Sequence, residues 1–318
     1  MTYILLLLGF VLLIKGADYF VSGSSKVASL LQIPPLLVGL TIVAFGTGAP
    51  EATISIIAAL EGSTEVTISN VVGSNIINTA LVVGLTAVIF PLKVESQTLR
   101  KEIPFVMLAS VALLVLMSDM QLQMTEVNVI TRSDGIILLL FFAIFMYYIF
   151  EIARNSRDKS LEVQVKTSKK EWGKNITITI AGLAGIILGG YFVVESSTTI
   201  AYMMGMSETL VGLTIVAIGS SLPELITSIT AALKKQSEIA LGNIVGSNIF
   251  NILFVLGISS IITPLPVNSK IFTDIFIMIL LTVALFLYSR TRLCIGKYEG
   301  LSLSFIYVMY LIYVIIRN

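Results

Sequence analysis

Ten apolar runs, most of them long enough to cross a lipid bilayer, constrain what this chain of 318 residues can fold into. A membrane-spanning helix needs about 17–25 predominantly apolar residues. Inside lipid the backbone must satisfy its own hydrogen bonds, so such runs predict helices. We therefore expect an all-α polytopic membrane protein with ten transmembrane helices. The predicted spans are 2–22, 36–60, 66–90, 103–118, 135–153, 175–196, 209–233, 239–262, 272–289 and 300–316.

The composition agrees with this fold class and excludes several functions. Hydrophobic residues make up 56% of the chain and charged residues 12%, with a mean hydropathy of +0.97. Soluble domains are far more polar. The net charge of +1 and the absence of a basic aromatic patch give no reason to expect a nucleic-acid partner. One cysteine, Cys294, and no histidine exclude an intrachain disulfide and argue against a zinc site. The first positive charge, Lys15, follows the first apolar run, which favours a transmembrane helix over a signal peptide.

Positive charges are distributed very unevenly between the two sets of loops. Ten spans would place 16 lysines and arginines on one face and three on the other. Because positive loops stay in the cytoplasm, the richer face is predicted to be cytoplasmic and both termini extracytoplasmic. We expect a multi-pass protein of the plasma (cell inner) membrane.

The chain repeats itself at a single, constant offset. The stretch VGLTIVAFGTGAPE at 38–51 matches VGLTIVAIGSSLPE at 211–224, with ten of fourteen positions identical. At the same offset, SNVVGSNIINT at 69–79 matches GNIVGSNIFNI at 242–252, and a weaker match links 16–28 to 189–201. One offset across three blocks indicates duplication of a whole half.

Each half would hold five spans, so the second half would enter the membrane from the opposite side. The predicted parts are a first inverted repeat at 1–153, a cytoplasmic connector at 154–174 and a second inverted repeat at 175–318. Inverted repeats are typical of secondary transporters, whose substrate site lies between the repeats. A duplicated structural bundle is the alternative, but the duplicated blocks are the polar ones. Since both repeats lie in one chain, we expect a monomer to suffice.

Prolines in the middle of the second and seventh spans predict that these helices are broken. Pro50 and Pro223 each remove a backbone hydrogen bond, and glycines precede both. We expect the breaks near Thr47 and Ser220. The freed carbonyls could bind a cation, although a simple kink satisfied by nearby hydroxyls is also common in membrane helices.

Glu51 and Glu224 follow the prolines at equivalent positions. In inverted repeats, two such carboxylates can meet at the pseudo-twofold axis. Oxygen-rich sites suit hard cations such as calcium and sodium. The alternative for either residue alone is a protonated, hydrogen-bonded glutamic acid.

The second duplicated block adds hydroxyl and amide oxygens. Ser74 and Asn78 lie on one helix face at i, i+4, as do Ser247 and Asn251. Ligation and interhelical hydrogen bonding are both open to them. Four further residues are expected to serve packing or close helix approach, namely Asn75, Asn248, Gly73 and Gly246. Lys15 and Asp18, at i, i+3, are expected to pair within the first span.

These motifs resemble the two repeats of the calcium/cation antiporter superfamily, most closely its prokaryotic sodium/calcium exchanger branch. The resemblance rests on GTGAPE and GSSLPE, each followed at one common spacing by the asparagine of GSNIIN or GSNIFN. It implies calcium export driven by sodium entry, with both ions as transported substrates, no organic cofactor and no enzymatic activity. It also implies that the first and sixth helices slide over the rest to alternate access.

The resemblance further implies which residues bind the ions. Glu51 and Glu224 would bind calcium and share sodium sites. Thr47 and Ser220 would bind through hydroxyl or carbonyl oxygens, and Ala44 and Ala217 through carbonyls. The remaining implied ligands are Ser74, Ser221 and Ser247 at flanking sodium sites and Asn78 and Asn251 at the centre.

Two departures from the family pattern affect the coupling. Gly48 stands where a serine often occurs, and Asn251 stands where several exchangers have aspartate, so the sodium-to-calcium ratio and potassium dependence stay open. The G-N-x-x-E pattern of the proton/calcium branch is absent, which favours sodium. A proton/calcium antiporter remains the nearest alternative. A cation channel is a second one, and an intramembrane enzyme is least favoured because no histidine or cysteine–base pair is available.

Overall fold

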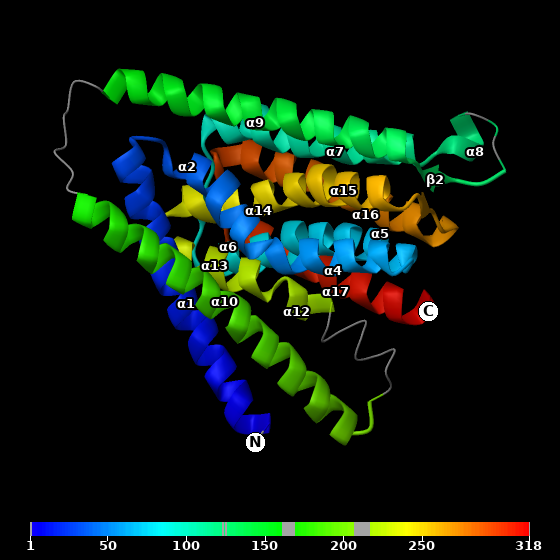
Figure 1. Cartoon of the computed structure of the whole chain (residues 1–318), viewed down its shortest axis with the longest axis horizontal. Helices are drawn as coiled ribbons and strands as arrows, with labels where there is room; N and C mark the ends of the chain where they lie inside the picture. The colour runs from blue at the N-terminus through cyan, green and yellow to red at the C-terminus, as the bar shows by residue number, and fades with distance from the viewer. Residues whose placement is uncertain (1, 123, 125, 161–168, 207–216, 318) are drawn as a thin grey trace.

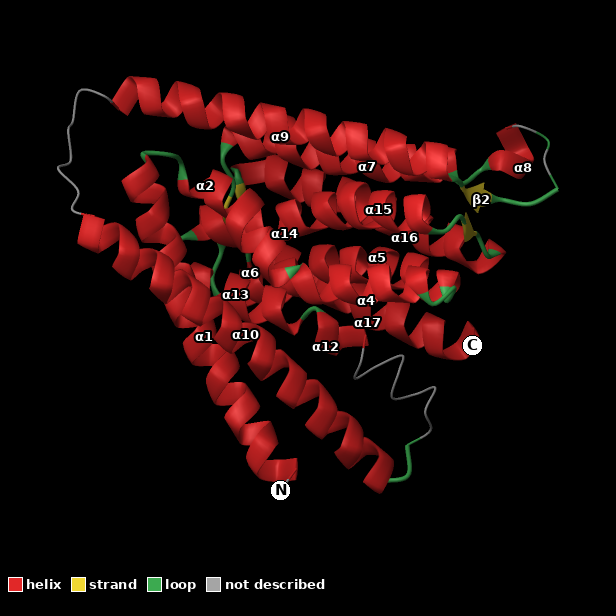
Figure 2. Cartoon of the chain, viewed as in Figure 1, coloured by secondary structure: helices red, strands yellow, loops and turns green. Residues whose placement is uncertain are grey.

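The computed structural model describes residues 2–122, 124, 126–160, 169–206 and 217–317, and almost all of them are helical (Figure 2). The predicted all-α class is confirmed. The only β structure in this described part is four strands of two residues each.

The first half of the chain contains two long helices and several shorter segments. Its second span is interrupted, and π-helical turns (η) occur at three places. In chain order the elements are α1 (Thr2–Leu31), α2 (Pro35–Val38), η1 (Gly39–Val43), α3 (Ala44–Thr47), α4 (Ala49–Leu60), α5 (Thr64–Ile76), η2 (Ile77–Val82), α6 (Val83–Ile89), β1 (Leu92–Lys93), η3 (Thr98–Glu102), α7 (Ile103–Leu116), α8 (Asp119–Leu122), β2 (Val129–Ile130) and α9 (Arg132–Ser160).

The second half repeats much of this order. Its elements are α10 (Lys169–Met203), α12 (Ala217–Ser220), α13 (Leu222–Leu233), α14 (Ser237–Ile249), η5 (Phe250–Val255), α15 (Leu256–Ile262), β3 (Leu265–Pro266), α16 (Ser269–Arg292), β4 (Cys294–Ile295) and α17 (Lys297–Arg317).

The sequence repeat is visible in the bounds of these elements. Moving α4, α5, η2, α6 and β1 forward by the offset of the sequence repeat reproduces α13, α14, η5, α15 and β3, residue for residue. The strands join the halves, because β1 pairs antiparallel with β4, and β2 with β3. Equivalent sequence blocks therefore fold into equivalent elements.

Length and composition identify fewer spans than the sequence predicts. Within the described residues, seven helices are long and apolar enough to cross a membrane, and an eighth span results if α2–α3 and α4 are counted together across a 49° bend. The predicted span 103–118 falls on α7, which has 14 residues. The predicted span 209–233 falls on the short helices α12 and α13, and its residues 209–216 lie outside the described part. A count of ten therefore stays a prediction.

Helices α1 and α10 form a closely packed pair that splays away from the other helices (Figure 1). Glycines line their contact. A Cβ atom on Gly16 would lie 2.7 Å from the Ile186 nitrogen, and one on Gly189 would lie 2.6 Å from the Leu13 nitrogen. Both helices extend beyond the predicted spans, since α1 continues to Leu31 and α10 begins at Lys169. The predicted spans therefore cover only the most hydrophobic part of each helix.

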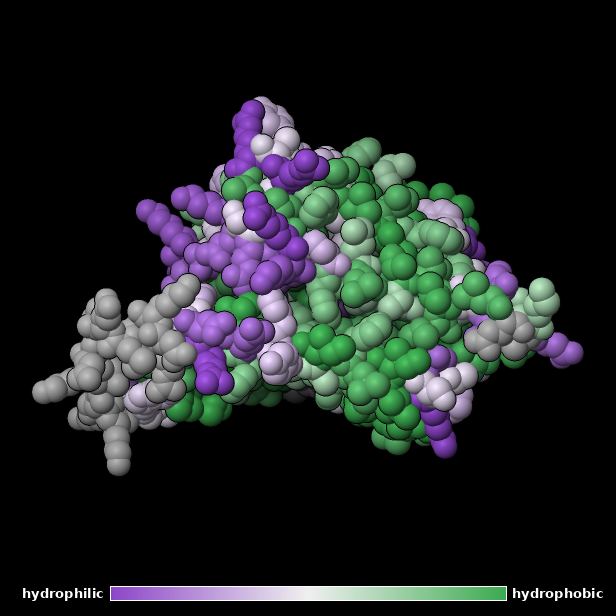
Figure 3. Space-filling view, turned by 90° about the horizontal axis from the view of Figure 1, so that it is seen from above, coloured by the Kyte–Doolittle hydropathy of each residue, from purple (hydrophilic) through white to green (hydrophobic). Residues whose placement is uncertain are grey.

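Helix α14 is the centre of the bundle. Every one of its residues except Glu238 is buried. It packs against the α2–η1 segment at very short range: a Cβ atom on Gly242 would lie 2.7 Å from the Leu36 carbonyl oxygen, and one on Gly246 would lie 2.6 Å from the Leu40 carbonyl oxygen. The face seen in Figure 3 has a broad apolar band, with hydrophilic residues gathered toward the two ends of the long axis. Such a band is what a lipid-embedded surface requires.

Candidate functional site

The second span breaks where the sequence predicts it. Helix α3 ends at Thr47, α4 begins at Ala49, and Gly48 between them has φ −77° and ψ −1°. Pro50 is in the first turn of α4, where its missing N–H is tolerated. Glu51 follows in the same turn, so its carboxylate lies near the positive end of the helix dipole.

The second half contains the same break. Helix α12 ends at Ser220 and α13 begins at Leu222, with Ser221 at φ −92° and ψ 7°. Glu224 occupies the first turn of α13, equivalent to Glu51. Both glutamates are almost completely buried, with exposed fractions of 0% and 1%.

The two glutamates share one buried region, because Ser221, at the start of the helix whose first turn carries Glu224, reaches the Glu51 carboxylate. One Glu51 oxygen, Oε1, accepts a hydrogen bond from the Ser221 hydroxyl at 3.3 Å. Among the described residues, Oε2 of Glu51 and both carboxylate oxygens of Glu224 have no hydrogen-bond partner. Leaving buried acceptors unpaired costs about 1–3 kcal/mol each, and more for charged groups. A cation bound between these oxygens would remove this energetic cost.

Two buried asparagines add further unpaired oxygens. The Oδ1 atoms of Asn78 and Asn251 have no hydrogen-bond partner in the described part of the chain, and the same is true of Nδ2 of Asn78. They are the second residues of the π-helical segments η2 and η5, at equivalent positions. Carboxylate and amide oxygens together form the kind of donor set that hard cations prefer.

Thr47 at the end of α3 and Ser247 on α14 supply further oxygens. Thr47 is fully buried, and its hydroxyl lies 3.0 Å from both the Val43 carbonyl oxygen and Asn243 Oδ1. Ser247 donates to the carbonyl oxygen of Ala44 at 3.4 Å, which places that carbonyl beside α14. The predicted residues of the first half therefore come together with those of α14.

The other predicted residues are placed as follows. Ser74 is buried in α5. Ser220 is half-buried at the end of α12 and lines a cavity described below. Ala217 begins α12, and its side chain lies outside the described part.

Sequence reasoning missed Asn70 and Asn243, which hold the broken helices in place. Asn70 Nδ2 donates to the Glu51 carbonyl at 3.2 Å and to Ser55 Oγ at 2.9 Å. Asn243 Nδ2 donates in the same way to the Glu224 carbonyl at 3.4 Å and to Ser228 Oγ at 3.0 Å. The available signal was the spacing: each asparagine precedes Ser74 or Ser247 at i, i+4, on the same helix face.

Some expectations about neighbouring residues need correction. Asp18 does not pair with Lys15 but with Lys234, at 2.8 Å, so it ties α1 to the end of α13. Gly246 does allow close helix approach, whereas a Cβ atom on Gly73 would meet no described residue within 4 Å. Asn248 makes the expected interhelical contact, because its amide donates to Thr79 Oγ1 at 2.8 Å.

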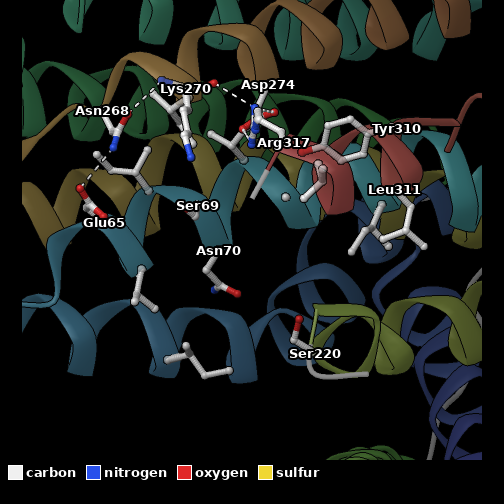
Figure 4. Close-up of a pocket in the computed structure, with 18 of the residues that line it drawn as sticks. Glu65, Ser69, Asn70, Ser220, Asn268, Lys270, Asp274, Tyr310, Leu311 and Arg317 are labelled. Carbon is white, nitrogen blue, oxygen red and sulfur yellow. Dashed lines mark hydrogen bonds and ion pairs between the residues drawn. The ribbon is translucent and has the colours of Figure 1, made fainter. Parts of the chain in front are cut away.

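A cavity of about 740 Å³ lies between α4, α5, α16 and α17 and reaches Ser220 (Figure 4). Arg317 and Asp274 form a two-pronged ion pair in its wall, at 2.9 and 3.0 Å. Asn268 donates to Glu65 at 3.5 Å on another part of the wall. Most of the lining surface is apolar, and the polar side chains of the wall are set within it.

Comparison with known proteins agrees with this geometry. The family described as Sodium/calcium exchanger protein matches residues 1–151 and 174–316. The chain is 38% identical to the "Putative antiporter CaxA" of Alkalimonas amylolytica, over 98% of each chain. It is 33% identical to the "Sodium/calcium exchanger MaX1" of Methanosarcina acetivorans, over 98% of this chain and 97% of the other.

Solved structures agree as well. The sodium-calcium exchanger NCX_Mj, soaked with 10 mM Na⁺ and without Ca²⁺, superposes with a TM-score of 0.83 at 28% identity, over 97% of each chain. The fold, the paired buried glutamates and these matches lead to one conclusion: the chain belongs to the sodium/calcium exchanger family of membrane cation antiporters.

Proposed function

We propose that this protein exports calcium in exchange for sodium by alternating access. One observation carries the proposal: two buried glutamates from equivalent helix breaks are linked through Ser221, and three of their four oxygens lack a hydrogen-bond partner among the described residues. A divalent cation would neutralise both carboxylates at once. The names of relatives such as MaX1 and NCX_Mj support sodium as the counter-ion.

The proposed ligands fall into a centre and two ends. Glu51 and Glu224 hold calcium together with the amide oxygens of Asn78 and Asn251. One end consists of Ala44, Thr47 and Ser247, and the other of their equivalents. These equivalents are Ala217, Ser220 and Ser74, and Ser221 joins them at that end.

Competition for these oxygens couples the two fluxes. If calcium and sodium use the same carboxylates, they cannot be bound in full at the same time. An empty site leaves two carboxylates buried without counter-charge, which is costly and resists the change of access. The protein would then cross between states only when loaded with one ion or the other.

We propose the following arrangement in the membrane. Ten helices form two inverted repeats at 1–153 and 175–318, joined by a cytoplasmic connector at 154–174, with both termini outside. The antiporter works as a monomer in the plasma membrane. The pair α1 and α10, tied to the core by contacts such as Lys234–Asp18, slides over the remaining helices.

Proton/calcium antiport is the second candidate, because a buried carboxylate can carry a proton as well as bind a metal ion. Glu51 and Glu224 would then be both ligands and proton carriers. The driving gradient separates the two candidates.

Calcium uptake into proteoliposomes tests the proposal. Vesicles loaded with sodium are diluted into sodium-free buffer at matched pH, and a pH gradient is applied in a parallel sample. We expect uptake that requires internal sodium and is lost in Glu51→Gln, while the matched variant of an exposed carboxylate, Glu61→Gln, retains it. Uptake driven only by the pH gradient would establish the proton/calcium alternative instead.

A further inference from the structure

The two ends of the candidate site are equivalent by sequence but differ at one ligand position. Ser221 follows the break in the second half, and its hydroxyl donates to Glu51 at 3.3 Å. The equivalent residue in the repeat of the first half is Gly48, which has no side chain. Glu224, the carboxylate at that end, correspondingly has both oxygens without a hydrogen-bond partner among the described residues.

Backbone conformation does not account for the glycine. Gly48 has φ −77° and ψ −1°, and Ser221 has φ −92° and ψ 7°. Both pairs of values lie in a region that any L-residue adopts, and the serine is present at one of them. A Cβ atom on Gly48 would lie 2.9 Å from the Ala44 carbonyl oxygen, so a serine here requires a backbone shift. The turn in the other half differs in this respect, because the Ser221 N–H donates to Ile218 whereas the Gly48 N–H donates to Ala44.

The neighbour of Gly48 differs between the halves. A Cβ atom on Gly48 would lie 3.3 Å from Cδ1 and 3.6 Å from Cε1 of Phe250. Phe250 is nearly buried and stacks on Phe254 with ring centroids 5.0 Å apart, while the ring of Phe45 lies 4.8 Å away. At the equivalent position of the first half stands the smaller Ile77. The phenyl ring thus borders the position where a serine hydroxyl would otherwise enter the site.

At the Glu224 end Thr47 keeps a hydroxyl, as its equivalent Ser220 does at the Glu51 end, so the two ends differ by the single hydroxyl of Ser221. The Thr47 hydroxyl lies 3.0 Å from both the Val43 carbonyl oxygen and Asn243 Oδ1, and the amide of Asn243 donates to the Glu224 carbonyl. A small monovalent cation needs several oxygens to replace its water, and the positive edge of an aromatic ring supplies none. The end at Glu51, by contrast, has the Ser221 hydroxyl on the carboxylate itself.

We propose that Gly48 and Phe250 remove the sodium site at the Glu224 end, so that this protein exchanges two sodium ions for one calcium ion without moving net charge. The inference rests on the proposed sodium/calcium exchange. Charge balance is consistent with it. Two glutamates are neutralised equally by one calcium ion or by two sodium ions, whereas a third sodium ion would leave an uncompensated positive charge in a buried site.

The coupling ratio can be measured at the point where opposing gradients balance. In proteoliposomes clamped at zero potential, a threefold sodium gradient should be balanced by a calcium gradient of about ninefold for two sodium ions, or about 27-fold for three, because equal free energies oppose each other. An imposed membrane potential should leave the balance point unchanged in the first case and shift it in the second.

We expect the wild type to balance at a calcium gradient of about ninefold, and we expect this balance point not to depend on the membrane potential. The variant Gly48→Ser/Phe250→Ile, which copies the residues of the other half, should move toward the balance point of three sodium ions and become voltage-sensitive. Phe250→Ile alone, which removes the ring without adding a hydroxyl, should keep the wild-type ratio.

A wild-type balance point at the three-sodium value, or one that follows the potential, would overturn the inference while leaving sodium/calcium exchange intact. Simultaneous measurement of labelled sodium and calcium fluxes in the wild type decides the ratio even if the double variant does not fold. Calcium flux that is insensitive to sodium would overturn both this inference and the proposed function.

Discussion

At the residue scale, Asn70 and Asn243 show how single hydrogen bonds fix the site. Each amide crosses from one helix to the carbonyl of a buried glutamate in the next. This hydrogen bond fixes the backbone carbonyl of the glutamate. The side-chain carboxylate of the same residue therefore keeps its direction. Groups that orient a metal ligand in this way are worth about 10- to 100-fold in metal affinity.

We therefore predict that Asn70→Ala and Asn243→Ala each weaken calcium binding by about tenfold or more. The backbone carbonyl of Glu51 or Glu224 would lose its hydrogen bond from the asparagine amide. Neither asparagine needs to contact the ion for this effect. The check is the calcium concentration for half-maximal transport. Asn268→Ala, which removes an exposed amide from Glu65, is the matched control and should leave this value unchanged. Wild-type values in both Asn70 and Asn243 variants would show that they serve packing alone.

The site was partly predictable at this scale. Glu51 and Glu224 stand out because a charge inside an apolar run is costly, and the prolines beside them predict the breaks. Asn70 and Asn243 did not stand out, because an asparagine on a buried helix face has many ordinary uses in packing. The ring of Phe250 beside Gly48 was also invisible, since nothing in the spacing shows which side chain faces the break.

At the element scale, helix α14 depends on glycines to reach η1. The position of a Cβ atom on Gly246, 2.6 Å from a backbone oxygen, leaves no room for a side chain. The sequence predicted close approach at Gly246 and could not identify η1 as the partner. Similarly, it predicted the apolar parts of α1 and α10, and their mutual contact through glycines became visible only in the structure.

We predict that Gly246→Ala destabilises the protein by about 1–3 kcal/mol, because the methyl group overpacks the contact between α14 and η1. Gly173→Ala, on the exposed start of α10 where a Cβ atom would meet nothing within 4 Å, is the control and should not destabilise. Thermal unfolding in detergent measures both. Equal melting temperatures for the two variants would mean that the helices separate easily at this point.

The tie between α1 and α13 gives a second prediction at this scale. Lys234 Nζ reaches the Asp18 carboxylate and also the Asp18 carbonyl, each at 2.8 Å. The pair is partly exposed, so Lys234→Met should change stability by less than about 1 kcal/mol. If α1 slides past α13 in each cycle, the contact must break and re-form, and the rate of sodium-driven calcium uptake should change severalfold. An unchanged rate would indicate that α1 and α13 move together.

At the scale of the whole molecule, duplication accounts for most of the architecture. The same bounds recur at the constant offset of the repeat across five pairs of elements, and the two strand pairs join one half to the other. The repeat was readable from sequence because its polar blocks are nearly identical. Function at this scale depends on where the halves differ, as Gly48 and Ser221 do.

The central claim is that Glu51 and Glu224 form one cation site shared by calcium and sodium. Equilibrium binding of labelled calcium to the purified protein, with and without sodium, tests it most directly. We predict saturable binding that sodium displaces in the wild type, and a loss of affinity of about 100-fold or more in both Glu51→Gln and Glu224→Gln, since removing one partner of a buried charge interaction costs about 2–5 kcal/mol. Glu61→Gln should bind as the wild type does. Undiminished calcium affinity in either buried-glutamate variant would contradict the claim.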